Sequence, residues 1–223
     1  TSEFEIDEQA VLASIDSQTK AIFFASPNNP TGNTASDKQI RTLLDTGVIV
    51  VVDETYYEFC GKSSLNLLSE YENLIILRTF SKWAGLAGLR IGLGVMSENL
   101  AGTMMSMKPP YNVNLAAEVA LTASLEDRET LMTRVDAIVH ERGRLMSKLY
   151  GIPHIKPYPS EANFILIQLP TGRGKAIFEG LCSRGIFLRY FGREPLTDFV
   201  RMSVGLPSEN DSVIDALTQL VGG

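Results

Sequence analysis

The chain has 223 residues, of which 44% are hydrophobic and 21% are charged. These ordinary globular proportions exclude the disordered, collagen-like and disulfide-scaffold classes, and they supply enough apolar residues for a sizeable core. The 26 acidic residues outnumber the 20 basic ones, and the resulting formal charge of −6 argues against wholesale nucleic-acid binding.

Several simple signals are missing from the sequence. No apolar run approaches the roughly 18 residues of a membrane-spanning helix, so we expect a soluble protein with no membrane partner. The two cysteines and two histidines form none of the closely spaced pairs that bind zinc, so we expect no metal site. The first residues lack the order of a signal peptide, which favours the cytoplasm, although an organellar protein without its transit peptide would look the same.

The first half of the chain alternates short β-branched runs with amphipathic stretches, which is typical of βαβ units around a mostly parallel sheet. Ser36 and Gln39 have the spacing of a capping box, which predicts the start of a helix. Two further helices are expected: a short one that begins near Lys82, and one that follows the strand at 90–96 and ends near Met107. Four runs are predicted to be strands: 20–25, 48–53, 74–79 and 90–96.

The second half begins with a helical, charge-rich stretch over 116–150. We predict a long helix there, broken near Glu126 and Asp127, which leads from one domain into the next. Beyond Pro153 the pattern is that of a smaller α+β domain. Its predicted elements are strands at 163–169, 186–190 and 199–204 and helices at 173–184 and 211–220.

Three loops follow predicted strands at their carboxyl ends, where open α/β sheets bind ligands. The first loop covers 26–32 and has the sequence SPNNPTG. Asparagine, proline and glycine are standard turn residues, so a rigid turn is one interpretation. A rigid loop that holds an asparagine amide towards a ligand oxygen explains the same residues equally well.

The second loop begins with Asp53 and Glu54, directly after the apolar run 48–52. A carboxylate at the mouth of a buried strand is partly desolvated and needs a cationic or N–H partner. This makes Asp53 a candidate site residue. For Glu54, a helix cap or a surface position is a sufficient explanation.

The third loop contains Lys82 amid small and apolar residues, with Thr79 and Ser81 before it and Arg90 after it. Desolvation makes a lysine amine a usable nucleophile, so the pattern favours a covalent cofactor site over a solvated surface. The two hydroxyls and the guanidinium are suited to hold a phosphate. Neither of the common glycine-rich nucleotide motifs is present.

Six motifs occur in order along nearly the whole chain: SPNNPTG, DETYYEF, LRTFSKWAGLAGLRIG, KPPYNVN, SEANF, and FLR followed by FVRMSVG. In this order they resemble the fold-type I, class I/II pyridoxal-phosphate aminotransferases, and within them most closely the histidinol-phosphate branch. The resemblance implies an α/β fold with a mostly parallel sheet and helices on both faces. Residues 1–125 are then the C-terminal part of the large cofactor-binding domain, and 126–223 form the small α+β domain.

The resemblance also implies roles for the residues of the loops. Lys82 matches the lysine that binds the cofactor aldehyde and then moves a proton between substrate and cofactor. Asp53 matches the partner of the pyridine nitrogen, and Asn29 and Tyr56 match donors to the phenolic oxygen of the ring. Lys82, Asp53 and Tyr56 are thus the implied catalytic residues. The implied clamp on the cofactor phosphate consists of Thr79, Ser81 and Arg90.

Residues of the second half match substrate-binding positions in these enzymes. Arg201 matches the arginine that binds the carboxylate of the amino acid, and Arg189 matches a second arginine that helps to hold the substrate phosphate. A surface arginine on an edge strand remains an alternative for Arg189. Asn163 either orients the substrate or satisfies buried backbone groups. Tyr111 and Asn112 lie either at a dimer interface near the pocket or in a turn between domains.

The implied activity is amino-group exchange between glutamate/2-oxoglutarate and a small phosphorylated amine. The best match is histidinol phosphate with imidazole acetol phosphate, in histidine biosynthesis. The implied cofactor is pyridoxal 5'-phosphate, and the implied assembly is a homodimer. Three alternatives remain: an aromatic amino-acid aminotransferase, a threonine-phosphate decarboxylase, and a non-catalytic binding or regulatory module of the same fold.

Members of this family carry a substantial segment before the position that matches Thr1. It includes a glycine-containing loop that helps to bind the cofactor phosphate and a tyrosine lent to the neighbouring subunit. We therefore expect this chain to be truncated at its N-terminus. The 223 residues would then hold the reactive lysine but only part of its site.

Overall fold

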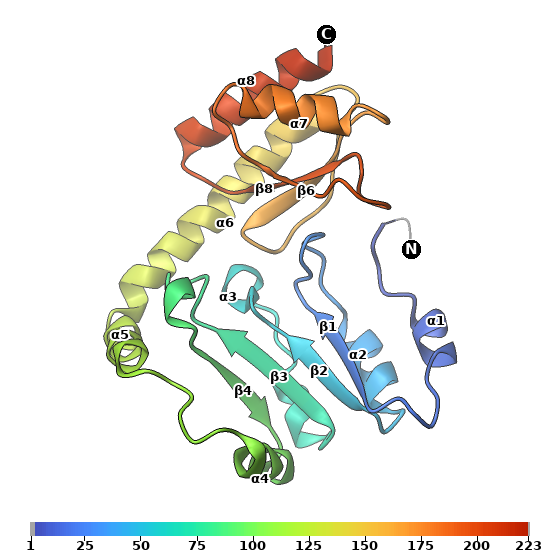
Figure 1. The fold of residues 1–223 in the computed structure, drawn as a ribbon, viewed down its shortest axis with the longest axis vertical. Helices are drawn as coiled ribbons and strands as arrows, with labels where there is room; N and C mark the ends of the chain where they lie inside the picture. The colour runs from blue at the N-terminus through green and yellow to red at the C-terminus, as the bar shows by residue number, and fades with distance from the viewer. Residues whose placement is uncertain (1–2, 223) are drawn as a thin grey trace. The chain divides into compact units, whose positions relative to one another are not determined.

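The computed structural model describes residues 3–222, which are drawn in Figure 1. The chain divides into two compact units. Unit 1 comprises Thr1–Asn28 and Asn33–Val135, and unit 2 comprises Asn29–Gly32 and Asp136–Gly223. Within the part of the chain that is described, no helix is both long enough and apolar enough to span a bilayer.

Unit 1 is built on a four-stranded sheet with the order β1-β2-β3-β4 (Figure 1). The first three strands are parallel, and the fourth pairs antiparallel with β3, so the predicted mostly parallel sheet is confirmed. In β2 the three valines at 50–52 are all buried, as expected for a strand covered on both faces. The strands are β1 (Ala21–Ala25), β2 (Ile49–Asp53), β3 (Leu74–Thr79) and β4 (Gly92–Met96).

Helix α2 (Asp37–Leu44) covers part of this sheet, with Ile40, Leu43 and Leu44 packed in the cluster that includes the buried side chains of β2 and β3. Its start confirms the predicted capping box, since Ser36 Oγ accepts from Gln39 N (3.3 Å) and Gln39 Oε1 accepts from Ser36 N (2.9 Å). The other helices of unit 1 are α1 (Glu8–Ala13), α3 (Tyr57–Cys60), α4 (Glu98–Met107), α5 (Leu115–Glu126) and the 3-10 turns η1 (Leu65–Ser69) and η2 (Ala87–Leu89).

The prediction of a helix that begins near Lys82 is wrong. The chain after β3 runs through a series of bends and forms only the three-residue turn η2. Gly85 explains the difference, because its φ of +70° is a left-handed conformation that interrupts a helix.

The long helical stretch is broken where predicted. Helix α5 ends at Glu126, and α6 (Arg128–Tyr150) begins after Asp127. Asp127 N donates to Ala123 O (3.1 Å) to close α5, while Asp127 O accepts from Leu131 N (3.2 Å) to begin α6. One aspartate thus belongs to the last turn of one helix and the first turn of the next.

Unit 2 has an antiparallel sheet with the order β5-β6-β8-β7. Buried side chains of β6 and β8 pack with α6, α7 and α8 in one core that contains Leu145, Ile165 and Leu217. The predicted strand over 186–190 is shorter than expected, and α8 begins earlier, at Pro207, a residue favoured in the first helical turn. The elements are β5 (Lys156–Pro157), β6 (Phe164–Gln168), α7 (Gly174–Cys182), β7 (Arg189–Tyr190), β8 (Phe199–Ser203) and α8 (Pro207–Gly222).

Candidate functional site

Asp53 is the last residue of β2, at the carboxyl end of the parallel strands of unit 1. Its Oδ1 accepts from Thr55 N (2.9 Å) and Thr55 Oγ1 (2.6 Å). Its Oδ2 has no hydrogen-bond partner within residues 3–222. The N–H partner expected for this carboxylate is therefore present, and one oxygen stays available for a ligand.

Tyr56 lies three residues after Asp53, at the N-cap of the short helix α3, and it is buried. Its carbonyl accepts from Phe59 N (3.1 Å). The turn between β2 and α3 thus carries both Asp53 and Tyr56 on a few residues. A tight turn of this kind leaves the two side chains little freedom to move apart.

Two hydroxyls meet at the end of β3. Thr79 Oγ1 lies 2.8 Å from Ser81 Oγ, accepts from Ser81 N (3.1 Å) and lies 3.3 Å from Ile91 O. The rings of Phe80 and Trp83 are buried and lie 5.8 Å apart, so they anchor the chain around Ser81. The paired hydroxyls are therefore held in place before any ligand binds.

Lys82 follows these hydroxyls and is exposed. The expectation that neighbouring apolar residues desolvate its amine is wrong, because Phe80 and Trp83 turn inwards while Lys82 points to solvent. Within the described part of the chain its Nζ makes no hydrogen bond or ion pair. The amine is accordingly free to react with a ligand.

Arg90 is placed near Thr79 by strand pairing rather than by a direct contact. Thr79 pairs with Gly92, two residues after Arg90, and an added Cβ at Gly92 would lie 2.6 Å from Arg78 O. Only glycine allows β4 to approach β3 this closely. Arg90 itself is exposed, has a φ of +56° and donates from Nη1 to Ala87 O (3.0 Å).

Glu54 is the residue whose importance sequence reasoning missed. It is neither a helix cap nor a surface acid, since it is 1% exposed and forms an ion pair with Arg78 (2.9 Å). Its partner lies on the neighbouring strand, so no local pattern identifies the pair. The nearby Glu58 is half-buried, and burial raises its pKa to about 7 despite the opposing attraction of Arg78.

In unit 2, Arg201 lies in the middle of β8. Its Nη1 donates to Asn29 Oδ1 (2.6 Å), and its guanidinium lies over the Phe164 ring at 5.0 Å. Its Nε is buried and has no hydrogen-bond partner within residues 3–222. A buried donor of a cation is costly to leave unsatisfied, so an anionic ligand is expected at this guanidinium.

Arg189 pairs directly with Arg201 across β7 and β8. It is exposed and lies 5.8 Å from the Phe191 ring. Two like charges directly opposite each other repel and destabilise a sheet. An anion bound between the two arginines would attract both of them and so replace this repulsion by a favourable interaction. The exposure of Arg189 is compatible with the alternative of a surface arginine on an edge strand. Its pairing with Arg201 favours an anion-binding role instead.

The segment 29–32 is anchored in unit 2. Gly32 O accepts from Glu161 N (2.8 Å), and the α-carbon of Gly32 lies against Ser160. The same segment carries Asn29, whose Oδ1 accepts from Arg201 Nη1. Asn163 is half-buried, and its carbonyl accepts from Val204 N (3.0 Å).

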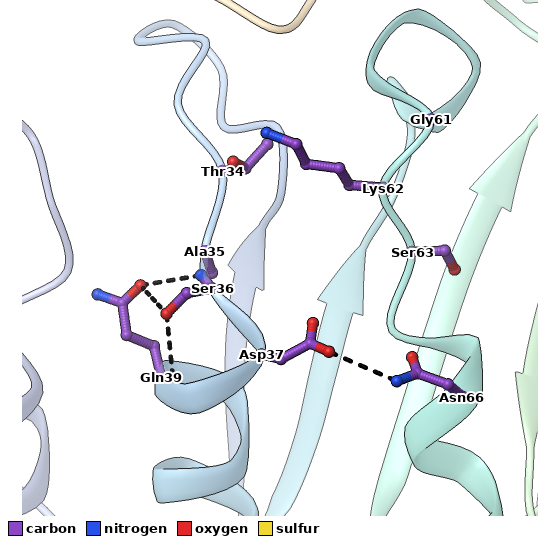
Figure 2. A pocket seen from close by; sticks show the side chains of 9 residues that line it. All are labelled: Thr34, Ala35, Ser36, Asp37, Gln39, Gly61, Lys62, Ser63 and Asn66. Carbon is purple, nitrogen blue, oxygen red and sulfur yellow. Dashed lines mark hydrogen bonds between the residues drawn. The ribbon is translucent and has the colours of Figure 1, made fainter.

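A polar surface pocket of about 760 Å³ lies at the start of α2 (Figure 2). Its polar groups already bond to one another, as in the Ser36–Gln39 cap and the contact of Asn66 Nδ2 with Asp37 Oδ2 (3.4 Å). None of the residues predicted to bind cofactor or substrate lines it. One lining residue, Ser63, is also a hydrogen-bond partner of Glu54.

Comparison with known proteins places these features in a family. Residues 1–217 match the family described as aminotransferase class I and II. A histidinol-phosphate aminotransferase from Roseiflexus castenholzii is 44% identical over 224 residues, covering 99% of this chain and 60% of the relative. A chloroplastic one from Nicotiana tabacum is 38% identical, covering 96% of this chain and 53% of the relative.

Solved structures agree with these sequence matches. The histidinol-phosphate aminotransferase from Clostridium acetobutylicum has a TM-score of 0.90 and 25% identity, covering 100% of this chain and 70% of that one. The enzyme from Sinorhizobium meliloti in complex with pyridoxal-5'-phosphate has a TM-score of 0.81 and 26% identity, covering 97% of this chain and 61% of that one. The chain spans 60% and 53% of the length of the two curated relatives reported above. It belongs to the class I and II aminotransferase family.

Proposed function

We propose that this chain carries the lysine-bearing part of a pyridoxal-phosphate-dependent aminotransferase. Its substrates would be glutamate/2-oxoglutarate and the pair histidinol phosphate/imidazole acetol phosphate, in histidine biosynthesis. The family match and the names of the relatives support this assignment. The structural observation that carries it is the free amine of Lys82, directly after the hydroxyl pair of Thr79 and Ser81.

The residues of unit 1 fit the cofactor. The Oδ2 of Asp53 has no partner within residues 3–222 and can receive a ring N–H, while the preformed Thr79–Ser81 pair offers hydroxyl donors to a phosphate. Arg90 supplies a cation next to the strand that pairs with Thr79. We propose that Asp53, Tyr56, Thr79, Ser81, Lys82 and Arg90 hold the cofactor, together with Asn29.

When bound, pyridoxal phosphate supplies a ring that accepts electrons from the substrate. Asp53 would hold a proton at the ring nitrogen, and the two hydrogen bonds from Thr55 would fix the orientation of its carboxylate. Lys82 Nζ would bind the cofactor and then carry the proton that leaves the substrate α-carbon. Tyr56 would donate to the phenolic oxygen.

The arginines of unit 2 fit an anionic substrate. Arg201 presents an unsatisfied buried Nε, and Asn29 fixes the orientation of its guanidinium from the other end. We assign the substrate carboxylate to Arg201 and the substrate phosphate to Arg189, with Asn163 as a further substrate contact. The planar guanidinium suits both acceptors because carboxylate and phosphate can each accept two parallel N–H bonds from it.

A homodimer is part of this proposal. Several apolar side chains of α4, α5 and the segment between them are exposed, and Tyr111 is 94% exposed. Exposed apolar clusters on soluble proteins commonly mark interfaces. We further propose that 1–125 belong to the large domain and 126–223 to the small one. We retain the cytoplasm as the location, with an organelle as the alternative because the plant relatives are named chloroplastic.

The experiment is a coupled assay of glutamate formation from histidinol phosphate and 2-oxoglutarate. It uses the 223-residue chain and a version extended at its N-terminus to the length of the relatives. Activity that disappears in Lys82→Ala but survives in Lys62→Ala supports the proposal, since Lys62 lies in the polar pocket of Figure 2. Carbon dioxide release in place of glutamate, or no turnover by the extended protein, would contradict it.

A further inference from the structure

The Glu54 carboxylate is almost fully enclosed, at 1% exposure, and accepts hydrogen bonds from three residues. Arg78 donates from Nε (3.1 Å) and Nη2 (2.9 Å), Ser63 from Oγ (2.9 Å) and Ser64 from its backbone N–H (2.7 Å). A buried carboxylate is tolerated only where such donors replace water. These donors therefore allow Glu54 only one position.

Arg78 is equally constrained. Its guanidinium lies over the Tyr57 ring, with Cζ 3.6 Å from the ring centroid, and Nη2 also donates to Ser63 Oγ (2.7 Å). A planar guanidinium with a carboxylate at its edge and an aromatic ring at its face has little freedom to rotate. The side chain thus ties β3 to α3 and to the segment after α3.

The pair lies directly beside the candidate cofactor residues in the sheet. Asp53 pairs with Leu77, and Glu54 N donates to Leu77 O (2.8 Å), so Glu54 and Arg78 form the next step of the ladder. Side chains alternate along a strand, so Glu54 and Arg78 lie on the face opposite to Asp53 and Thr79. The ion pair therefore joins the ends of β2 and β3 on one face of the sheet, while the side chains that would contact a ligand lie on the other face.

We propose that Glu54 and Arg78 are positioning residues for cofactor binding, an inference that rests on the function proposed above. One segment, 53–57, carries Asp53 and Tyr56, and the other, 78–82, carries the hydroxyl pair and Lys82. The ion pair is a buried side-chain link that holds these two segments in register. Its loss lets them move relative to each other without removing any group that touches the cofactor.

The test is Arg78→Lys, which keeps the charge but not the two-pronged geometry. Arg41→Lys is a matched control, because Arg41 also pairs with a glutamate, Glu70, and lies 5.8 Å from a tyrosine ring. Its pair is far more exposed, since the Glu70 side chain is 49% exposed and that of Glu54 only 1%. For Arg78→Lys we expect the Kd of pyridoxal phosphate to rise about tenfold, as is typical when the support of a binding group is removed. We also expect a shift in the pH at which the visible band of the bound cofactor changes. Arg41→Lys should change neither.

A second measurement needs no cofactor. Amide hydrogen exchange of the cofactor-free protein should become faster in both 53–57 and 78–82 in Arg78→Lys and should stay unchanged in Arg41→Lys. If Arg78→Lys does not fold, the double variant Glu54→Leu/Arg78→Met is used for both measurements instead. It replaces the ion pair by apolar groups of similar volume.

The outcomes separate the inference from the proposed function. A folded variant with unchanged Kd, unchanged band titration and unchanged exchange overturns the positioning role, because a merely structural pair would affect only stability. A wild-type chain that forms no Lys82-dependent band contradicts the proposed function instead. In that case the exchange measurement alone decides whether the pair orders the two segments.

Discussion

The contact of Gly32 with Ser160 allows a sharp test of how the segment 29–32 is held. Gly32 has a φ of +79°, and an added Cβ would lie 2.6 Å from Ser160 Cβ and closer still to its Oγ. Gly32→Ala therefore meets two penalties. The left-handed backbone costs an alanine about 1–2 kcal/mol, and forcing a methyl group into an occupied space costs about 1–3 kcal/mol.

Together these penalties predict a loss of about 2–5 kcal/mol in the free energy of unfolding, measured by urea denaturation. Gly47→Ala is the matched control, because Gly47 has nearly the same φ, +77°, with no atom within 4 Å of the added Cβ. It should lose only the backbone penalty of about 1–2 kcal/mol. Adding Ser160→Gly to Gly32→Ala removes two of the three closest atoms and should recover most of the difference.

Equal losses in Gly32→Ala and Gly47→Ala would refute this reasoning, since the steric contact would then contribute nothing. The contact also has a consequence for ligand binding. Asn29 lies three residues before Gly32 and bonds to Arg201, so displacing the segment should weaken the binding of an amino acid carboxylate as well.

Three further predictions concern residues away from this contact. Burial raises the pKa of Glu58 from 4.5 to about 7, so the folded state holds its proton more tightly; the resulting stability is present below pH 4.5 and lost as pH rises through about 7. Glu58→Gln should flatten this part of the pH dependence of Tm, and an unchanged profile would contradict the assignment. Asn210→Ala should cost about 2–4 kcal/mol in urea unfolding, because it removes one donor to the buried Glu141, which keeps Arg144, and both side-chain partners of the Gly205 backbone. A loss below 1 kcal/mol, about the size of an ordinary exposed substitution, would argue against a role for this network. Gly92→Ala should loosen β4 from β3 and weaken the binding of pyridoxal phosphate in equilibrium titration, and retained affinity would show that the close approach is dispensable.

Local signals predicted much of the fold. The capping box at Ser36, the break near Asp127 and the buried valines of β2 each depend on residues close together in sequence, and each is present in the structure. The helix predicted from Lys82 failed because the apolar pattern of that segment comes from two anchoring aromatic side chains, not from a helical face. Periodicity alone does not separate these two cases.

The contacts that the sequence did not predict are long-range. Glu54 and Arg78 are 24 positions apart, Asn210 and Glu141 are 69 apart, and Asn29 and Arg201 are 172 apart. Each residue type has an ordinary local explanation, such as a cap, a turn or a surface charge. Only the three-dimensional structure, through the pairing of strands and the anchoring of the segment 29–32, shows which partner each of these side chains has.

The central claim is that Lys82 is the residue that binds pyridoxal phosphate. The most direct measurement adds the cofactor to the folded chain, traps the lysine–cofactor bond with borohydride and locates the added mass by peptide mapping. We expect modification at Lys82, with loss of the visible band in Lys82→Ala and its retention in Lys62→Ala. Modification spread over surface lysines, or none in a chain shown to be folded by circular dichroism, would contradict it.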